Sequence, residues 1–64
     1  MVRKHIDINN DHAVGLRDDQ VVIAVPVAGT MTRPEALRLA AWLAAVADPG
    51  QEEFGEVLEA VLHS

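Results

Sequence analysis

Histidines are the residues of this sequence best suited to chemistry, and there are three of them, His5, His12 and His63, with no cysteine. Structural zinc sites usually include cysteine ligands, and a histidine base needs a nucleophile or a carboxylate beside it. The sequence places no such partner near His12, which we expect to pack at the margin of the core. We therefore predict no metal site and no bound cofactor.

Two acidic pairs, Asp18-Asp19 and Glu52-Glu53, invite a catalytic interpretation. General acid–base chemistry needs two carboxylates with separated pKa values in one cleft, whereas neighbouring turn or helix-surface carboxylates face water. Ala28-Gly29-Thr30 lacks the lysine and further glycines of a phosphate-binding loop. We predict no catalytic residue and expect that the protein is not an enzyme.

The elements that position these residues begin with strands. Residues 2–8 alternate weakly and fit a short edge strand, joined by a three-residue turn that would place Ile6 opposite Val14. Residues 12–17 and 20–27 form a predicted hairpin around Asp18-Asp19. Its register puts one set of apolar residues on a core face, namely Val14, Leu16, Val21, Ile23 and Val25, and leaves Ala13, Gly15, Val22 and Ala24 on the other.

Two helices follow the hairpin. Thr32 and Glu35 match a capping box, with Pro34 in the first turn, and the helix should run to about Ala47 and stop at residues 48–50. Residues 51–63 form an amphipathic surface helix that Asp48 or Gln51 could cap, with an apolar stripe of Phe54, Val57, Leu58, Val61 and Leu62. The 64 residues thus predict one small α+β domain, an antiparallel two- or three-stranded meander followed by two helices.

Nine consecutive residues from Leu39 to Ala47 carry no polar side chain. A helix that is apolar all round must be covered on every face, and so short a chain buries only about 60% of its extended surface. We therefore expect a homodimer that works by binding protein. Its contact would use either the helix face of Trp42, Arg38, Ala41 and Ala45 or the thin sheet face of Val22 and Ala24.

Charge is unevenly distributed along the chain. The net charge of −5 comes from residues 48–64, which contain five acids and no lysine or arginine. An acidic surface repels phosphates, so we expect no nucleic-acid binding, and a basic host protein is a possible partner. The surface facing it would be Glu52, Glu53, Glu56 and Glu59. Because Arg3-Lys4 is followed by polar residues, and nine apolar residues cannot cross a bilayer, we expect a cytoplasmic protein without a membrane span.

The segment from the hairpin ending Val-Val-Ile-Ala-Val-Pro to the capped, alanine-rich helix resembles small hairpin-helix proteins of actinobacteria and their phages. The resemblance covers residues 12–48 at most. It implies an uncharacterised phage or prophage product, a class in which some members bind and alter host proteins, and it implies no site residue.

Two alternatives involve DNA. A strand before two helices resembles the ribbon-helix-helix repressors, dimers whose paired strands enter the major groove. The predicted strand Val21–Val27 offers no base-reading side chain, however, and the net charge has the wrong sign for DNA binding. An acidic mimic of DNA would need more carboxylates on one face than the five that one helix supplies.

Overall fold

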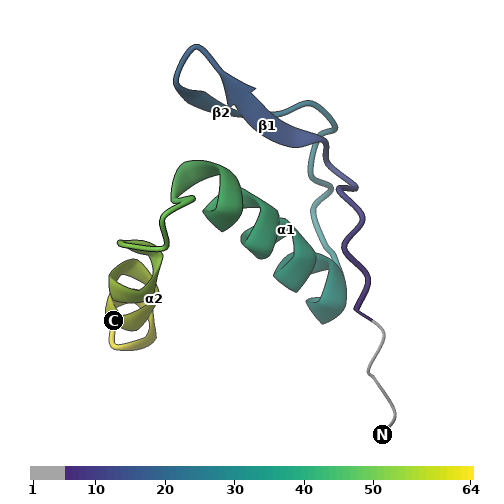
Figure 1. Ribbon diagram of the computed structural model, residues 1–64. Coiled ribbons are helices and arrows are strands. Elements are labelled where there is room, and N and C mark those ends of the chain that lie inside the picture. Colours follow the sequence, from purple (N-terminus) through teal and green to yellow (C-terminus); the bar gives the residue numbers. More distant parts are fainter. Residues whose placement is uncertain (1–5) are drawn as a thin grey trace, which may run out of the picture.

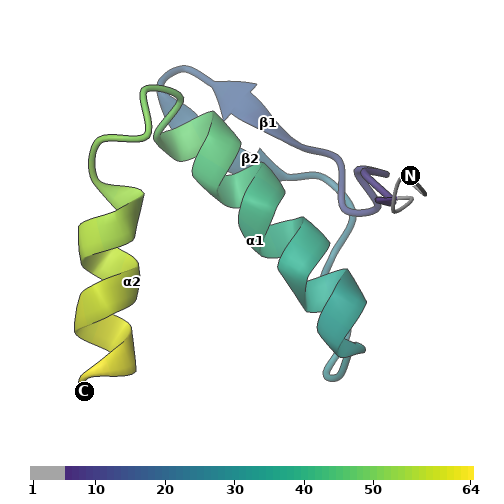
Figure 2. The same ribbon diagram turned by 60° about the horizontal axis from the view of Figure 1, so that its bottom comes forward.

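The computed structural model describes residues 6–64 as a hairpin and two helices. The elements are β1 (Val14–Arg17), β2 (Gln20–Ile23), α1 (Arg33–Ala47) and α2 (Phe54–Leu62). The hairpin lies over the C-terminal half of α1, and α2 stands to one side of α1 (Figures 1 and 2). The predicted α+β arrangement is confirmed, with two strands in the sheet of the described part.

The hairpin has the predicted register. Val14 pairs with Ile23 and Leu16 with Val21. Asp18 and Asp19 form a two-residue loop with φ values of 50° and 66°, as a type I′ turn requires, and such a turn matches the twist of its strands. Pairing continues past the strand ends, because the Val25 N–H donates to the His12 carbonyl at 3.0 Å.

The predicted edge strand is wrong for residues 6–8, which form no strand, and its remainder lies outside the described residues. In place of a third strand, the side-chain amide of Asn10 pairs with the backbone of Val14. Oδ1 of Asn10 accepts from the Val14 N–H at 2.9 Å, and Nδ2 donates to the Val14 carbonyl at 3.0 Å. The Val14 N–H and C=O point away from β2. The Asn10 side chain therefore takes the hydrogen bonds that a third strand, with Ile6 opposite Val14, would have made.

The core is smaller than predicted. Among the described residues, Val14, with 6% of its surface exposed, is the one buried apolar side chain. The other predicted core residues of the sheet are exposed, Leu16 at 62%, Val21 and Ile23 at 40% and Val25 at 47%. The physical reason is that, within residues 6–64, α1 is the one helix that packs extensively against the hairpin.

Helix α1 begins and ends where the sequence predicts. The Thr32 hydroxyl accepts from the Glu35 N–H at 3.3 Å, and the Glu35 carboxylate accepts from the Thr32 N–H at 3.1 Å. These bonds form the predicted capping box. The Thr32 N–H, together with the Thr32 hydroxyl that donates to Oε1 of Glu35 at 2.8 Å, lowers the pKa of the Glu35 carboxyl. Leu39, Leu43 and Val46 are half-buried.

Helix α2 begins at Phe54, three residues later than predicted. The Asp48 carboxylate accepts hydrogen bonds from the backbone N–H groups of Glu52, Glu53 and Phe54 at 3.0, 2.9 and 2.8 Å. These bonds hold residues 52 and 53 in a turn ahead of the helix, and they lower the pKa of Asp48. The N-cap position is Glu53, whose side chain makes no capping hydrogen bond, so neither Asp48 nor Gln51 is the N-cap; Asp48 instead accepts the N–H groups at the start of α2 from six residues before Phe54.

Candidate interaction surface

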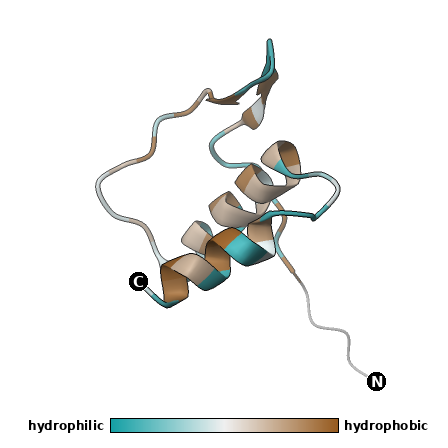
Figure 3. Cartoon of the chain, turned by 90° about the vertical axis from the view of Figure 1, so that its left-hand side faces the viewer, coloured by the Kyte–Doolittle hydropathy of each residue, from teal (hydrophilic) through white to brown (hydrophobic). Residues whose placement is uncertain are grey.

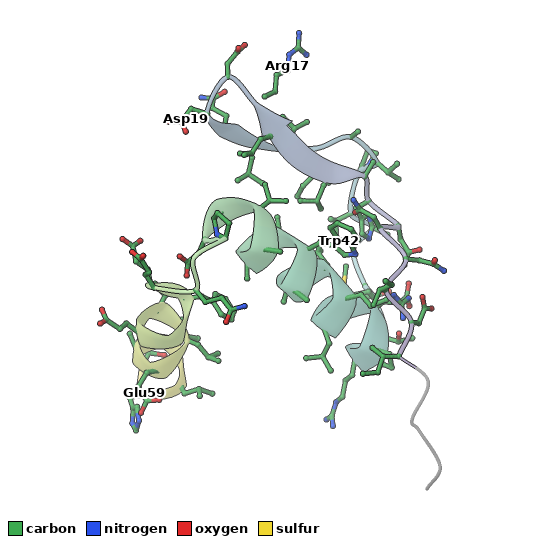
Figure 4. All side chains as sticks on the ribbon, viewed as in Figure 1. Arg17, Asp19, Trp42 and Glu59 are labelled. Carbon is green, nitrogen blue, oxygen red and sulfur yellow. The ribbon has the colours of Figure 1, made fainter. Side chains whose placement is uncertain are left out.

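Trp42 lies between α1 and the irregular segment that precedes β1. Its indole Nε1–H donates to the backbone carbonyl of Ile8 at 3.0 Å. In Figure 4 the side chain points from α1 toward that segment, and it is half-buried there. The predicted interface residue is therefore partly covered by its own chain, through a segment that sequence reasoning had assigned to the sheet.

Arg38 holds the same segment by charge. Its Nη2 lies 3.0 Å from Oδ2 of Asp11, its Nε donates to that atom at 3.3 Å, and its Nη1 lies 3.4 Å from Oδ2 of Asp7. The hydrogen bonds to Asp11 raise the pKa of the Arg38 guanidinium. Arg38 and Trp42 together fasten residues 7–11 along α1.

Ala41 and Ala45, the other two predicted helix positions, are exposed. They line an open groove of about 350 Å³ between α1 and residues 6–8. The groove is almost wholly apolar. Sequence reasoning missed its other apolar walls, because Ile6 and Ile8 were placed in a strand and Leu37 was assigned no role. These three side chains are each about 70% exposed, at 69% for Ile6, 72% for Ile8 and 71% for Leu37.

A second groove joins α1 to α2. It has a volume of about 560 Å³ and includes Ala41 and Ala45 again, so the two grooves meet along α1. On the α2 side its walls are Phe54 and Gly55. We name the exposed positions of α1 between and beside these grooves the alanine face: Ala36, Leu37, Ala40, Ala41, Ala45 and Ala47.

The apolar residues of α2 face solvent. Figure 3 shows an apolar side and a polar side on this helix, and every residue of α2 is exposed. Whereas α1 packs against both strands, α2 makes no contact of that extent with any element. We name Phe54, Val57, Leu58, Val61 and Leu62 the α2 stripe; their exposed fractions run from 41% for Phe54 to 69% for Leu62.

The four glutamates predicted to face a partner are exposed. The backbones of Glu52 and Glu53 belong to the turn held by Asp48. Glu59 lies on the outer side of α2 in Figure 4, and its Oε1 is 3.0 Å from Nε2 of His63. The structure brings these residues to one end of the molecule.

The predicted sheet contact lies elsewhere. Val22 is half-exposed and Ala24 is exposed. Val21 and Ile23 share a face of the hairpin with Val14, and Val22 lies on the opposite face. The structure therefore separates Val22 and Ala24 from Ala41 and Ala45. The two predicted contacts are distinct surfaces.

The other candidate residues have local contacts. Nδ1 of His12 lies 3.1 Å from the Val25 carbonyl at the end of the hairpin, and Asp19 lies at the exposed hairpin tip in Figure 4. Within residues 6–64, no group of three or more His, Asp or Glu side chains is arranged to hold a metal ion. None of the helices there has the length and apolar character needed to cross a bilayer.

Comparison with known protein families, with curated proteins and with solved structures finds no match to this chain. The resemblance to actinobacterial and phage hairpin-helix proteins therefore stays a prediction.

Proposed function

We propose that this chain is a protein-interaction module that forms a homodimer and acts by binding, not by catalysis. The observation that carries the proposal is the α2 stripe, five large apolar side chains along one side of the helix that are each at least 41% exposed, on an element that packs extensively against no other element of the described chain. Contiguous apolar surface of this kind marks interaction sites in soluble proteins.

The length of α2 also favours a partner. Isolated helices shorter than about 12 residues are marginal in water, and α2 has nine residues, with Gly55 in its first turn. Its N-cap residue, Glu53, makes no side-chain capping bond, and the Asp48 carboxylate reaches no residue of α2 beyond Phe54. The remaining order would come from packing of the α2 stripe.

We propose a second, basic protein as the target of the dimer. The four exposed glutamates near α2 support this, because they form an acidic surface without lysine or arginine in residues 48–64. The phage or prophage origin rests on the sequence resemblance. A phage or host protein is then the natural class of target.

Sedimentation equilibrium at micromolar concentrations tests the homodimer. We expect a species of twice the 6.9 kDa chain mass that dissociates on dilution. A single species at the mass of one chain throughout the concentration range would contradict the proposal.

The acidic surface needs its own experiment. A variant with Gln in place of Glu52, Glu53, Glu56 and Glu59 should still form the dimer but lose basic proteins that the wild-type chain retains from a host lysate. If the same proteins bind both baits equally, the acidic surface is not the binding site.

A further inference from the structure

We infer that the α2 stripe of one copy packs on the alanine face of α1 of the second copy. The α2 stripe of the second copy packs in the same way on α1 of the first. The inference rests on the proposed homodimer and specifies its interface. The occupant of the groove along α1 is thus a second copy of this chain.

The alanine face suits an incoming helix. Small side chains let two helix axes approach to about 8 Å, the close end of the usual range. Ala41 and Ala45 lie at the centre of this face, with one groove on each side, and Leu37 continues it toward the start of α1. Large side chains of the α2 stripe would fill the grooves that alanine leaves open.

The connection between the helices keeps α2 from covering its own α1. Asp48 binds three successive backbone N–H groups at the start of α2, and Gln51 in the linker has a φ of 57°. With this linker, Phe54 and Gly55 reach the groove at the C-terminal end of α1 while the later turns of α2 point away (Figure 2). Leu58 and Leu62 are therefore available to another molecule.

Charge favours α1 over α2 as the surface that receives the stripe. The charged side chains within α2 are Glu56 and Glu59, so pairing two α2 helices would bring like charges together. The six residues of the alanine face carry no charge, and Arg33 lies at its N-terminal end. The carboxylates that line the two grooves, Asp7 and Asp48, are already bound within the chain, Asp7 by Arg38 and Asp48 by backbone N–H groups. A partner's α2 would therefore pack on a neutral stripe.

Engineered disulfides can test the pairing cleanly, because the natural chain has no cysteine. Chains carrying Ala41→Cys are mixed with chains carrying Leu58→Cys under mild oxidation, and the intact masses of the products are measured. A disulfide needs Cα atoms within about 7 Å. We expect the mixed 41–58 product to exceed both like-with-like products several-fold.

Matched controls use Leu16, a leucine on the hairpin that is exposed at 62%, against 44% for Leu58. Leu16→Cys should form little product with Ala41→Cys. In sedimentation, Leu58→Glu should raise the dimer dissociation constant by about tenfold or more, whereas Leu16→Glu should leave it unchanged. Far-UV circular dichroism of each variant confirms that the helices are retained.

The remaining outcomes separate the two proposals. A wild-type chain that never dimerises overturns both. A dimer that crosslinks best through Leu58→Cys with itself shows an α2 to α2 interface and overturns this inference alone. A chain carrying both cysteines that closes within one molecule shows that α2 folds onto its own α1, which also overturns it.

Discussion

Replacement of Asn10 by alanine tests why the sheet stops at two strands. The change removes both hydrogen bonds to the backbone of Val14, at 2.9 and 3.0 Å, while the rest of the hairpin is untouched. Val14 is the most buried apolar residue of the described chain, with 6% exposure. Its N–H and C=O would then lack partners beside the core.

The cost follows from that burial. A buried backbone group left without a partner costs about 1–3 kcal/mol, but water can enter the space that the Asn10 side chain vacates. For the two groups together we expect a loss of about 2 kcal/mol in the free energy of unfolding. In a domain of this size such a loss lowers the melting temperature by about 10 °C.

Urea unfolding followed by Trp42 fluorescence measures this loss, at one fixed chain concentration because dimerisation contributes to stability. Asn9→Ala is the control, since the Asn9 side chain makes no hydrogen bond with residues 6–64. Hydrogen exchange of the Val14 amide supplies a local measurement and should accelerate in Asn10→Ala. If both variants unfold at the same urea concentration and Val14 exchanges as slowly as in the wild type, Asn10 does not replace a third strand.

Three further predictions follow from the caps and the charged contacts. Thr32→Ala should lower stability by about 1 kcal/mol through loss of the capping box, as measured by thermal melting, while Thr32→Ser should restore most of it. Because folding lowers the pKa of Asp48, its stabilisation of α2 is complete above the ordinary aspartate value of about 4 and is lost as the pH falls through the lower folded value. Circular dichroism should show that loss of helix, and Asp48→Asn should be less helical at neutral pH and should lack this acid-dependent step. Arg38→Gln should release residues 7–11, so that Trp42 fluorescence shifts to longer wavelength; an unchanged spectrum would contradict the role given to Arg38.

Local chemistry made several elements predictable. The capping box at Thr32 and the Pro-Gly stop after Asp48 satisfy or terminate backbone hydrogen bonds within a few residues, so the bounds of α1 follow from the sequence. The hairpin register is equally local, because a two-residue loop leaves one pairing for Leu16 and Val14. The amphipathic stripe of α2 follows from its 3.6-residue period.

The segment before β1 was decided by contacts distant in sequence. Alternation of Ile6 and Ile8 is compatible with a strand, but Arg38 and Trp42, some 30 residues away, bind this segment instead. Asn10 then takes the hydrogen bonds that a strand would have used. The pattern of residues 6–8 alone therefore cannot show whether they pair as a strand or contact α1.

Composition alone predicts that apolar surface remains uncovered, because a cysteine-free chain of 64 residues has too little material to cover an all-apolar helix. The tertiary structure decides which surface that is. Trp42 is partly covered by residues 6–8, while the alanine face and the α2 stripe stay exposed, since the direction of α2 is set by three hydrogen bonds to one carboxylate. The direction of α2 depends on these tertiary hydrogen bonds, which the periodicity of apolar residues in the sequence does not predict.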